Sequence, residues 1–295
     1  MRFAAVACLA ACFIAAGCGG SSSAQEESDA PTLKALWRAP GEDVAIVPGS
    51  ADFAPGKVRL TFLVVDKQGR LVIRPTAKIW LARSLEAKPF AETTARSEKI
   101  GVAGVEPGEA PEIFVTELDL EEPGTYWLLA EPVGGRKIQA VGNVVVKDEA
   151  EAPDVGDEVP ASDSPTLADA TLEQLTTSNV PDAELYQASI AQALAAKKAF
   201  VVVFATPRYC TSRTCGPVVE VVSSVRERNP ALRFLHVEIY ENNDPTQGEN
   251  RWVKEWKLPS EPWIFVVGAD GKVRDRFEGT VSVRELDEAV ARIPS

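Results

Sequence analysis

Residues 199–218 read AFVVVFATPRYCTSRTCGPV and constrain the fold more than any other part of the chain. The apolar run Phe200–Phe204 predicts a buried strand. Two cysteines follow, and after Cys215-Gly216-Pro217 apolar residues recur at helical spacing, at positions 218, 221, 222 and 225. Pro217 suits the first turn of a helix, where its missing N–H is no loss. The stretch therefore predicts a buried strand, a cysteine loop and a helix that begins beside Cys215.

A thiol at the beginning of a helix is a candidate reactive group. Unpaired backbone N–H groups and the helix dipole stabilise a thiolate there, and Arg208 and Arg213 lie nearby in the sequence. We therefore expect Cys215 to be the catalytic nucleophile and Cys210 to be its resolving or structural partner. The alternative is a static Cys210–Cys215 disulfide that holds a surface loop, and the sequence leaves both open.

Around these two cysteines the chain resembles the thioredoxin-like superfamily. Cys215-Gly216-Pro217 matches the superfamily's Cys-Gly-Pro-Cys motif, with Val218 where the second cysteine belongs. Downstream, residues 259–265 (PSEPWIF) resemble its cis-proline loop, with Pro262 as the cis residue. The resemblance runs from about residue 183 to residue 294 and implies thiol–disulfide exchange. It departs from the superfamily in the strand 201–203, which carries no acidic residue.

The same resemblance suggests where a substrate would bind. We expect Pro262 to help bind an extended substrate strand and Glu261 to lie next to the cysteines. Trp263 could form an apolar wall with Trp252 and Trp256, although core packing is the more common fate of tryptophan. Glu238 is a further candidate that could equally face solvent.

Two neighbouring families fit less well. Pro207 and Thr211 match the first part of the peroxiredoxin pattern, but the cysteine that should follow comes one residue late. Copper-delivery proteins use a cysteine pair plus a distant histidine. The only histidine here, His236, lies in an expected strand, and we interpret it as structural. The sequence therefore predicts no metal site and no cofactor.

The first residues predict where the protein is located. An apolar run ends in Ala15-Ala16-Gly17-Cys18, which resembles the bacterial lipobox and implies cleavage before Cys18 and lipidation of that residue. The alternative is an ordinary secretory signal. We expect residues 1–17 to be the signal peptide and residues 18–35 a flexible tether, with the protein on the extracytoplasmic face of the bacterial cell membrane.

The charge narrows the possible partners. A net charge of −12 argues against nucleic acid, which needs clustered basic residues, and against a polybasic membrane patch. We expect membrane attachment through the lipid anchor only, and thiols or disulfides of exported proteins as partners.

Upstream of an acidic, proline-containing linker (residues 148–166), short apolar segments alternate with turns. About seven strands are expected in residues 36–147, and Tyr126 resembles the corner tyrosine of immunoglobulin-like domains. The polar segment Arg83–Glu109 is expected to be irregular, and it is a candidate interaction loop. The remaining residues, 167–295, would form the cysteine-bearing domain.

The predicted fold class is thus a two-domain chain, an all-β immunoglobulin-like sandwich followed by an α/β thioredoxin-like domain. The predicted function is thiol–disulfide exchange with exported proteins. Cys215 and Cys210 would carry this oxidoreductase activity. The alternative is a non-catalytic interaction module with a structural Cys210–Cys215 disulfide.

Overall fold

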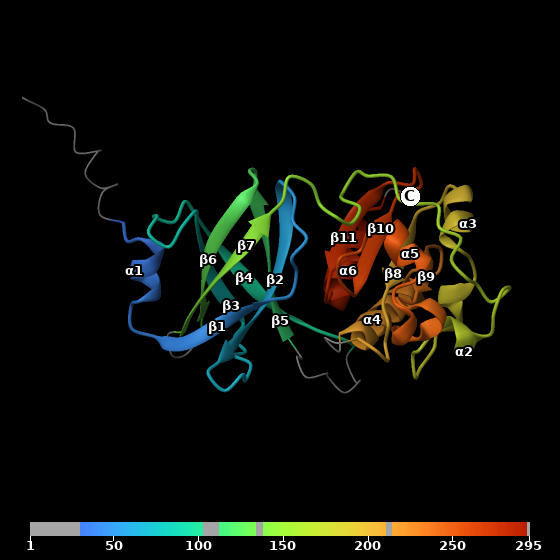
Figure 1. Ribbon diagram of the computed structural model, residues 1–295, viewed down its shortest axis with the longest axis horizontal. Coiled ribbons are helices and arrows are strands. Elements are labelled where there is room, and N and C mark those ends of the chain that lie inside the picture. Colours follow the sequence, from blue (N-terminus) through green and yellow to red (C-terminus); the bar gives the residue numbers. More distant parts are fainter. Residues whose placement is uncertain (1–29, 103–111, 134–137, 211–213, 294–295) are drawn as a thin grey trace, which may run out of the picture. The chain divides into compact units, whose positions relative to one another are not determined.

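Seven strands of the first half pair into one closed sheet. The computed structural model describes residues 30–102, 112–133, 138–210 and 214–293. The chain divides into two compact units, residues 1–31 and residues 32–295, and all the helices and strands named here belong to the second. The strands run in the order β1-β2-β5-β4-β3-β6-β7, and the parallel pairing of β1 with β7 closes the barrel (Figure 1). Their bounds are β1 (Glu42–Pro48), β2 (Gly56–Asp66), β3 (Thr76–Ala82), β4 (Ala91–Lys99), β5 (Glu112–Leu120), β6 (Gly124–Val133) and β7 (Ile138–Val146).

The barrel encloses a single apolar core because its strands alternate in polarity. In β2, Leu60, Phe62 and Val64 are buried inside, and Phe62 stacks on Phe114 of β5 with ring centroids 5.3 Å apart. A short helix, α1 (Leu33–Trp37), packs beside β3, β6 and β7 through the fully buried Leu33.

The corner predicted around Tyr126 is present. Its hydroxyl donates a hydrogen bond to the Glu122 carbonyl (2.7 Å) and accepts one from the Glu122 N–H (3.3 Å). The Arg83 guanidinium lies 3.9 Å from the centre of the tyrosine ring. The prediction that Arg83–Glu109 is irregular is wrong, because the segment contains β4. Seven of the nine β4 residues are polar or charged, so the strand lacks the alternation by which strands are recognised.

Four further strands form a second sheet in the order β11-β10-β8-β9. β8 (Phe200–Phe204) and β9 (Arg233–Val237) are parallel and are joined through α4 (Cys215–Arg228). β10 (Trp263–Val267) runs antiparallel to β8 and to β11 (Val273–Glu278). The predicted strand 200–204 and the predicted helix beginning beside Cys215 are confirmed.

Both faces of this sheet are covered, which explains why β8 and β10 are apolar throughout. Val201 and Val203 pack with α4 and with α6 (Val283–Ala291), whereas Phe200, Val202 and Phe204 face the opposite side. The opposite side is covered by α3 (Ile190–Ala195) and α5 (Arg251–Glu255). The remaining elements are short: α2 (Leu172–Leu175), η1 (Ala183–Tyr186), η2 (Glu241–Asn243) and η3 (Pro245–Gln247).

The acidic segment 148–166 is held against the second sheet. The Gly156 N–H donates to the Val273 carbonyl (2.9 Å), and the Val159 N–H donates to the Gly271 carbonyl (3.0 Å). Ala152 and Val159 are buried in the core on that side. The segment is therefore ordered by the chain that follows it.

The fold class predicted from the sequence is wrong. The protein is mostly β, with a closed seven-stranded barrel and a second sheet of four strands, and it is not an immunoglobulin-like sandwich followed by an α/β thioredoxin-like domain. Alternating strands look the same locally in a sandwich and in a barrel, and only the β1–β7 pairing distinguishes the two. In the second sheet only β8 and β9 are parallel, so the sheet needs a single helical crossover connection. An α/β fold instead repeats such connections between successive parallel strands.

Candidate functional site

The two cysteines flank the start of α4. After β8 the chain turns, and the Cys210 N–H donates to the Thr206 carbonyl (3.1 Å). Residues 211–213, which include Arg213, lie outside the described residues. Thr214 precedes the helix, and its carbonyl accepts the Val218 N–H (3.0 Å). Cys210 therefore lies beside the first residue of the helix, Cys215.

The sulfur that receives a helix N–H group is that of Cys210. The backbone N–H of Cys215 donates to Cys210 Sγ (3.3 Å). The two residues are thiols in this structure and are not joined as a disulfide. Cys215 is completely buried, whereas Cys210 keeps 9% of its surface exposed. The stabilisation expected at a helix start thus acts on Cys210.

Cys215 does not have the properties predicted for it. Its hydrogen bond with the Cys210 side chain and its burial raise the pKa of the Cys215 thiol above the ordinary value, and the negative charges of Cys210 and Glu261 act in the same direction. The pKa of Cys215 therefore shifts in the direction opposite to the one that the sequence predicted. The helix begins where expected, but its first residue turns its side chain into the core, among Val218, Val219 and Val222.

Glu261 completes a cluster with the two cysteines. Cys210 Sγ, Cys215 Sγ and a carboxylate oxygen of Glu261 all lie within 4.8 Å of one another. The Glu261–Pro262 peptide bond is cis. Both the cis bond and the position of Glu261 next to the cysteines confirm what the sequence predicted.

The two residues that follow Glu261, Pro262 and Trp263, are buried. Pro262 is buried, and its carbonyl accepts the Gly279 N–H (2.8 Å). Trp263 is fully buried, stacks on Phe265 at 5.5 Å and donates its indole N–H to the Ser260 hydroxyl (3.1 Å). Trp263 and Trp256 are both fully buried, so both side chains are packed in the core.

Two tyrosines lie close to the cysteines. Tyr209, directly before Cys210, is 38% exposed and meets Tyr240 edge to face, with ring centroids 6.5 Å apart. Burial raises the pKa of the Tyr240 hydroxyl, as do the nearby charges of Glu261 and Glu249. The tyrosine pair therefore supplies an aromatic surface beside the cluster.

His236 is structural, as expected. Its Nε2 donates to the Ala205 carbonyl (3.0 Å) in the tautomer in which Nδ1 accepts from the Tyr186 hydroxyl (2.5 Å). Burial lowers its pKa, so the ring is neutral. Glu238 is also buried, and its carboxylate accepts hydrogen bonds from Thr177 N–H (2.5 Å) and Thr177 Oγ1 (2.8 Å), which corrects the solvent-facing alternative.

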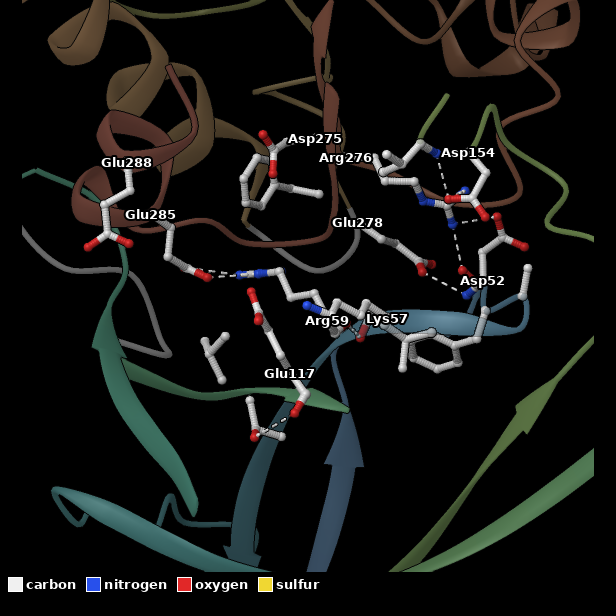
Figure 2. A pocket seen from close by; sticks show the side chains of 18 of the residues that line it. Asp52, Lys57, Arg59, Glu117, Asp154, Asp275, Arg276, Glu278, Glu285 and Glu288 are labelled. Carbon is white, nitrogen blue, oxygen red and sulfur yellow. Dashed lines mark hydrogen bonds and ion pairs between the residues drawn. The ribbon is translucent and has the colours of Figure 1, made fainter. Parts of the chain in front are cut away.

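A second concentration of charge lines a groove of about 940 Å³ between β2 and β11, hereafter the charged groove. Figure 2 shows Arg59 reaching Glu285 and Arg276 reaching Asp52. Arg59 binds Glu285 through Nε (2.8 Å) and Nη2 (3.1 Å), a two-pronged pair. Arg276 Nη2 donates to Asp52 Oδ2 (2.9 Å). Glu278 accepts the N–H groups of Ala51 (2.7 Å) and Asp52 (2.8 Å).

The acids of these pairs are ionised. Burial acts to raise the pKa of Asp52, but the Glu151 N–H and the charge of Arg276 outweigh it, and the pKa lies below the ordinary value. Burial likewise opposes ionisation of Glu285, and the charge and hydrogen bonds of Arg59 lower its pKa. These opposite charges bind each other, and they fasten β2 to α6 and the segment before β2 to β11, which is a structural role. The sequence analysis named none of these residues, because each partner lies more than 200 positions away.

No family model and no curated protein matches this chain. In the part of residues 30–293 that the structure describes, no helix is both long enough and apolar enough to cross a bilayer. Cys18 lies outside the described residues.

Proposed function

We propose that this protein exchanges disulfides with exported proteins, with Cys210 as the attacking thiolate and Cys215 as the resolving thiol. One observation carries the proposal: Cys210 Sγ accepts the first N–H of α4 and lies beside a second thiol that is more deeply buried. A hydrogen bond from N–H favours a thiolate, and the thiolate is the nucleophile in disulfide exchange.

The reaction has two steps. The Cys210 thiolate attacks a disulfide of the partner, forming a mixed disulfide and releasing one partner sulfur as a thiolate. Cys215 then loses its proton and attacks Cys210 Sγ, which forms the Cys210–Cys215 disulfide and releases the second partner sulfur. The partner gains two electrons and two protons, and the cysteine pair loses them. The reverse sequence transfers a disulfide to a partner dithiol.

Two further features support the proposal. The motifs around Cys215-Gly216-Pro217 and Pro262 resemble those of the thioredoxin-like superfamily, and a relationship to that superfamily is part of the proposal. The lipobox-like sequence ending at Cys18 supports a lipid-anchored location on the extracytoplasmic face of a bacterial membrane, where exported proteins acquire disulfides.

Trapping experiments test the assignment of roles. We expect Cys215→Ser to accumulate a mixed disulfide with a model peptide disulfide, with the peptide attached to Cys210 as read by peptide mass. Cys210→Ser should lower the rate of exchange at least about 100-fold, because the attacking thiolate is lost. A mixed disulfide found on Cys215 instead, or full exchange by Cys210→Ser, would refute these roles.

The complete burial of Cys215 favours a second function, a non-catalytic interaction module in which both cysteines are structural. The two functions differ in a redox titration of the full chain. Exchange requires a reduction potential comparable with that of cellular thiols, whereas a structural bridge has a potential below about −300 mV. A value in that lower range, together with no trapped species in Cys215→Ser, establishes the second function.

A further inference from the structure

The cysteine cluster contains three anionic ligand atoms of the kinds that bind metal ions. Two are sulfurs and one is a carboxylate oxygen, from Cys210, Cys215 and Glu261. Three atoms with mutual distances within 4.8 Å fit in a circle with a radius of about 2.8 Å, the longest distance divided by the square root of three. Zn–S bonds are about 2.3 Å and Zn–O bonds about 2.0–2.2 Å long. A shift of less than an ångström per side chain therefore brings all three within bonding distance of one ion.

The surroundings of the cluster suit a bound cation. Cys210 Sγ accepts the Cys215 N–H, and a backbone hydrogen bond from Thr206 reaches Cys215, so both sulfurs are oriented by backbone groups. Burial decreases from Cys215 through Cys210 to the half-buried Glu261. Glu261 is therefore the ligand closest to the solvent.

We infer that the reduced Cys210–Cys215 pair and Glu261 form a binding site for one thiophilic divalent cation, with Zn²⁺ as the best match. Two thiolates select against Mg²⁺ and Ca²⁺, and a mixed sulfur and oxygen set suits Zn²⁺. His236 takes no part, because both of its ring nitrogens are bonded to protein groups. Three protein ligands leave one position of a tetrahedral ion for water or a partner thiolate. The sequence predicted no metal because only His236 was considered as a third ligand, although Glu261 was expected next to the cysteines.

This inference goes beyond disulfide exchange and does not rest on it. Binding requires only that the two thiols and the carboxylate converge, whereas exchange also requires a partner disulfide. If both hold, the ion occupies the sulfurs in the reduced state, and formation of the Cys210–Cys215 disulfide releases it. Metal occupancy would then report the redox state of the pair.

Co²⁺ is the probe, because thiolate coordination gives it an intense charge-transfer absorption. The protein is the full chain with Cys8, Cys12 and Cys18 replaced by serine, which leaves Cys210 and Cys215 as its only thiols. We expect the reduced protein to bind one equivalent of Co²⁺ with that absorption, and Zn²⁺ to displace it. Glu261→Gln should weaken binding at least about 10-fold, because even the loss of a group that only supports a ligand typically costs about 10- to 100-fold in metal affinity.

Three comparisons make the result decisive. Cys210→Ser and Cys215→Ser should each remove the charge-transfer band, and oxidation of the pair should do the same. Glu249→Gln, which changes an exposed carboxylate of the neighbouring loop, should bind Co²⁺ like the parent. Absence of stoichiometric binding, or equal affinity in Glu261→Gln and the parent, would overturn the inference. Exchange rates measured with a chelator present report on the proposed function separately.

Discussion

The cysteine cluster and the charged groove both gather ionisable side chains, but they do so in opposite ways. In the charged groove each buried acid faces a base, as Asp52 faces Arg276 and Glu285 faces Arg59. In the cluster, Cys210, Cys215 and Glu261 can only be neutral or negative, so they repel one another when ionised. Opposite charges that satisfy each other stabilise a structure, whereas like groups held together mark a site for chemistry or for a cation.

This difference has a consequence that can be measured. Changes in the charged groove should alter the free energy of unfolding and leave exchange and Co²⁺ binding intact. Changes in the cysteine cluster should do the reverse. A variant that alters both properties to the same degree would show that the two regions do not differ in this way.

The largest effect on stability is expected for Asp52→Ala. The Asp52 side chain is 1% exposed and binds Arg276 as well as the N–H groups of Glu151 and Ala152. Its removal leaves the arginine charge buried without its partner, and breaking such a pair lowers the free energy of unfolding by about 3–5 kcal/mol. Urea denaturation measures the change.

The matched control is Asp270→Ala, which breaks the pair with Arg274 at the protein surface (2.6 Å). Surface pairs contribute little, so its unfolding curve should stay close to that of the parent. Equal shifts in the two variants would contradict a structural role for the charged groove.

The sequence predicted those parts of the molecule that depend on near neighbours. The apolar run of β8, the start of α4 at Cys215 and the corner at Tyr126 each follow from a few adjacent residues, and each is confirmed. Glu261 was predicted correctly because it adjoins Pro262. These features need no knowledge of how distant segments pair.

The errors arise where the structure depends on long-range pairing. Barrel closure joins β1 to β7, nearly 100 residues later, and no local pattern reports it. The Arg276–Asp52 pair spans 224 positions. Residue spacing also does not report which of the two sulfurs receives the helix N–H, and in the structure it is that of Cys210.

An intermediate effect is expected for Gly279→Ala, at the turn between β11 and α6. Gly279 has a φ of +73°, and a Cβ there would lie 2.4 Å from the Gly49 carbonyl oxygen. The strained backbone and the clash should lower the free energy of unfolding by about 2–3 kcal/mol. Gly69→Ala is the control, since its φ is +76° but nothing lies within 4 Å, and strain alone should lower stability by about 1 kcal/mol. Indistinguishable urea midpoints for the two variants would mean that the Gly49 contact contributes nothing.

The smallest effect is expected in the pH dependence of stability that Glu285 provides. Its pKa is lowered in the folded protein by Arg59, although burial opposes the shift. Its contribution is therefore complete above the unfolded-state pKa of about 4.3, and it is lost as the pH falls through the folded-state value. The difference in unfolding free energy between the parent and Glu285→Gln should be greatest near neutral pH and should shrink toward pH 3, as followed by urea denaturation across that range. Glu288→Gln, which removes an exposed carboxylate one helical turn away, should follow the parent at every pH. If the difference between the parent and Glu285→Gln stays constant down to pH 3, the pair with Arg59 does not depend on ionisation. The contrast between the charged groove and the cysteine cluster would then have to rest on packing instead of charge.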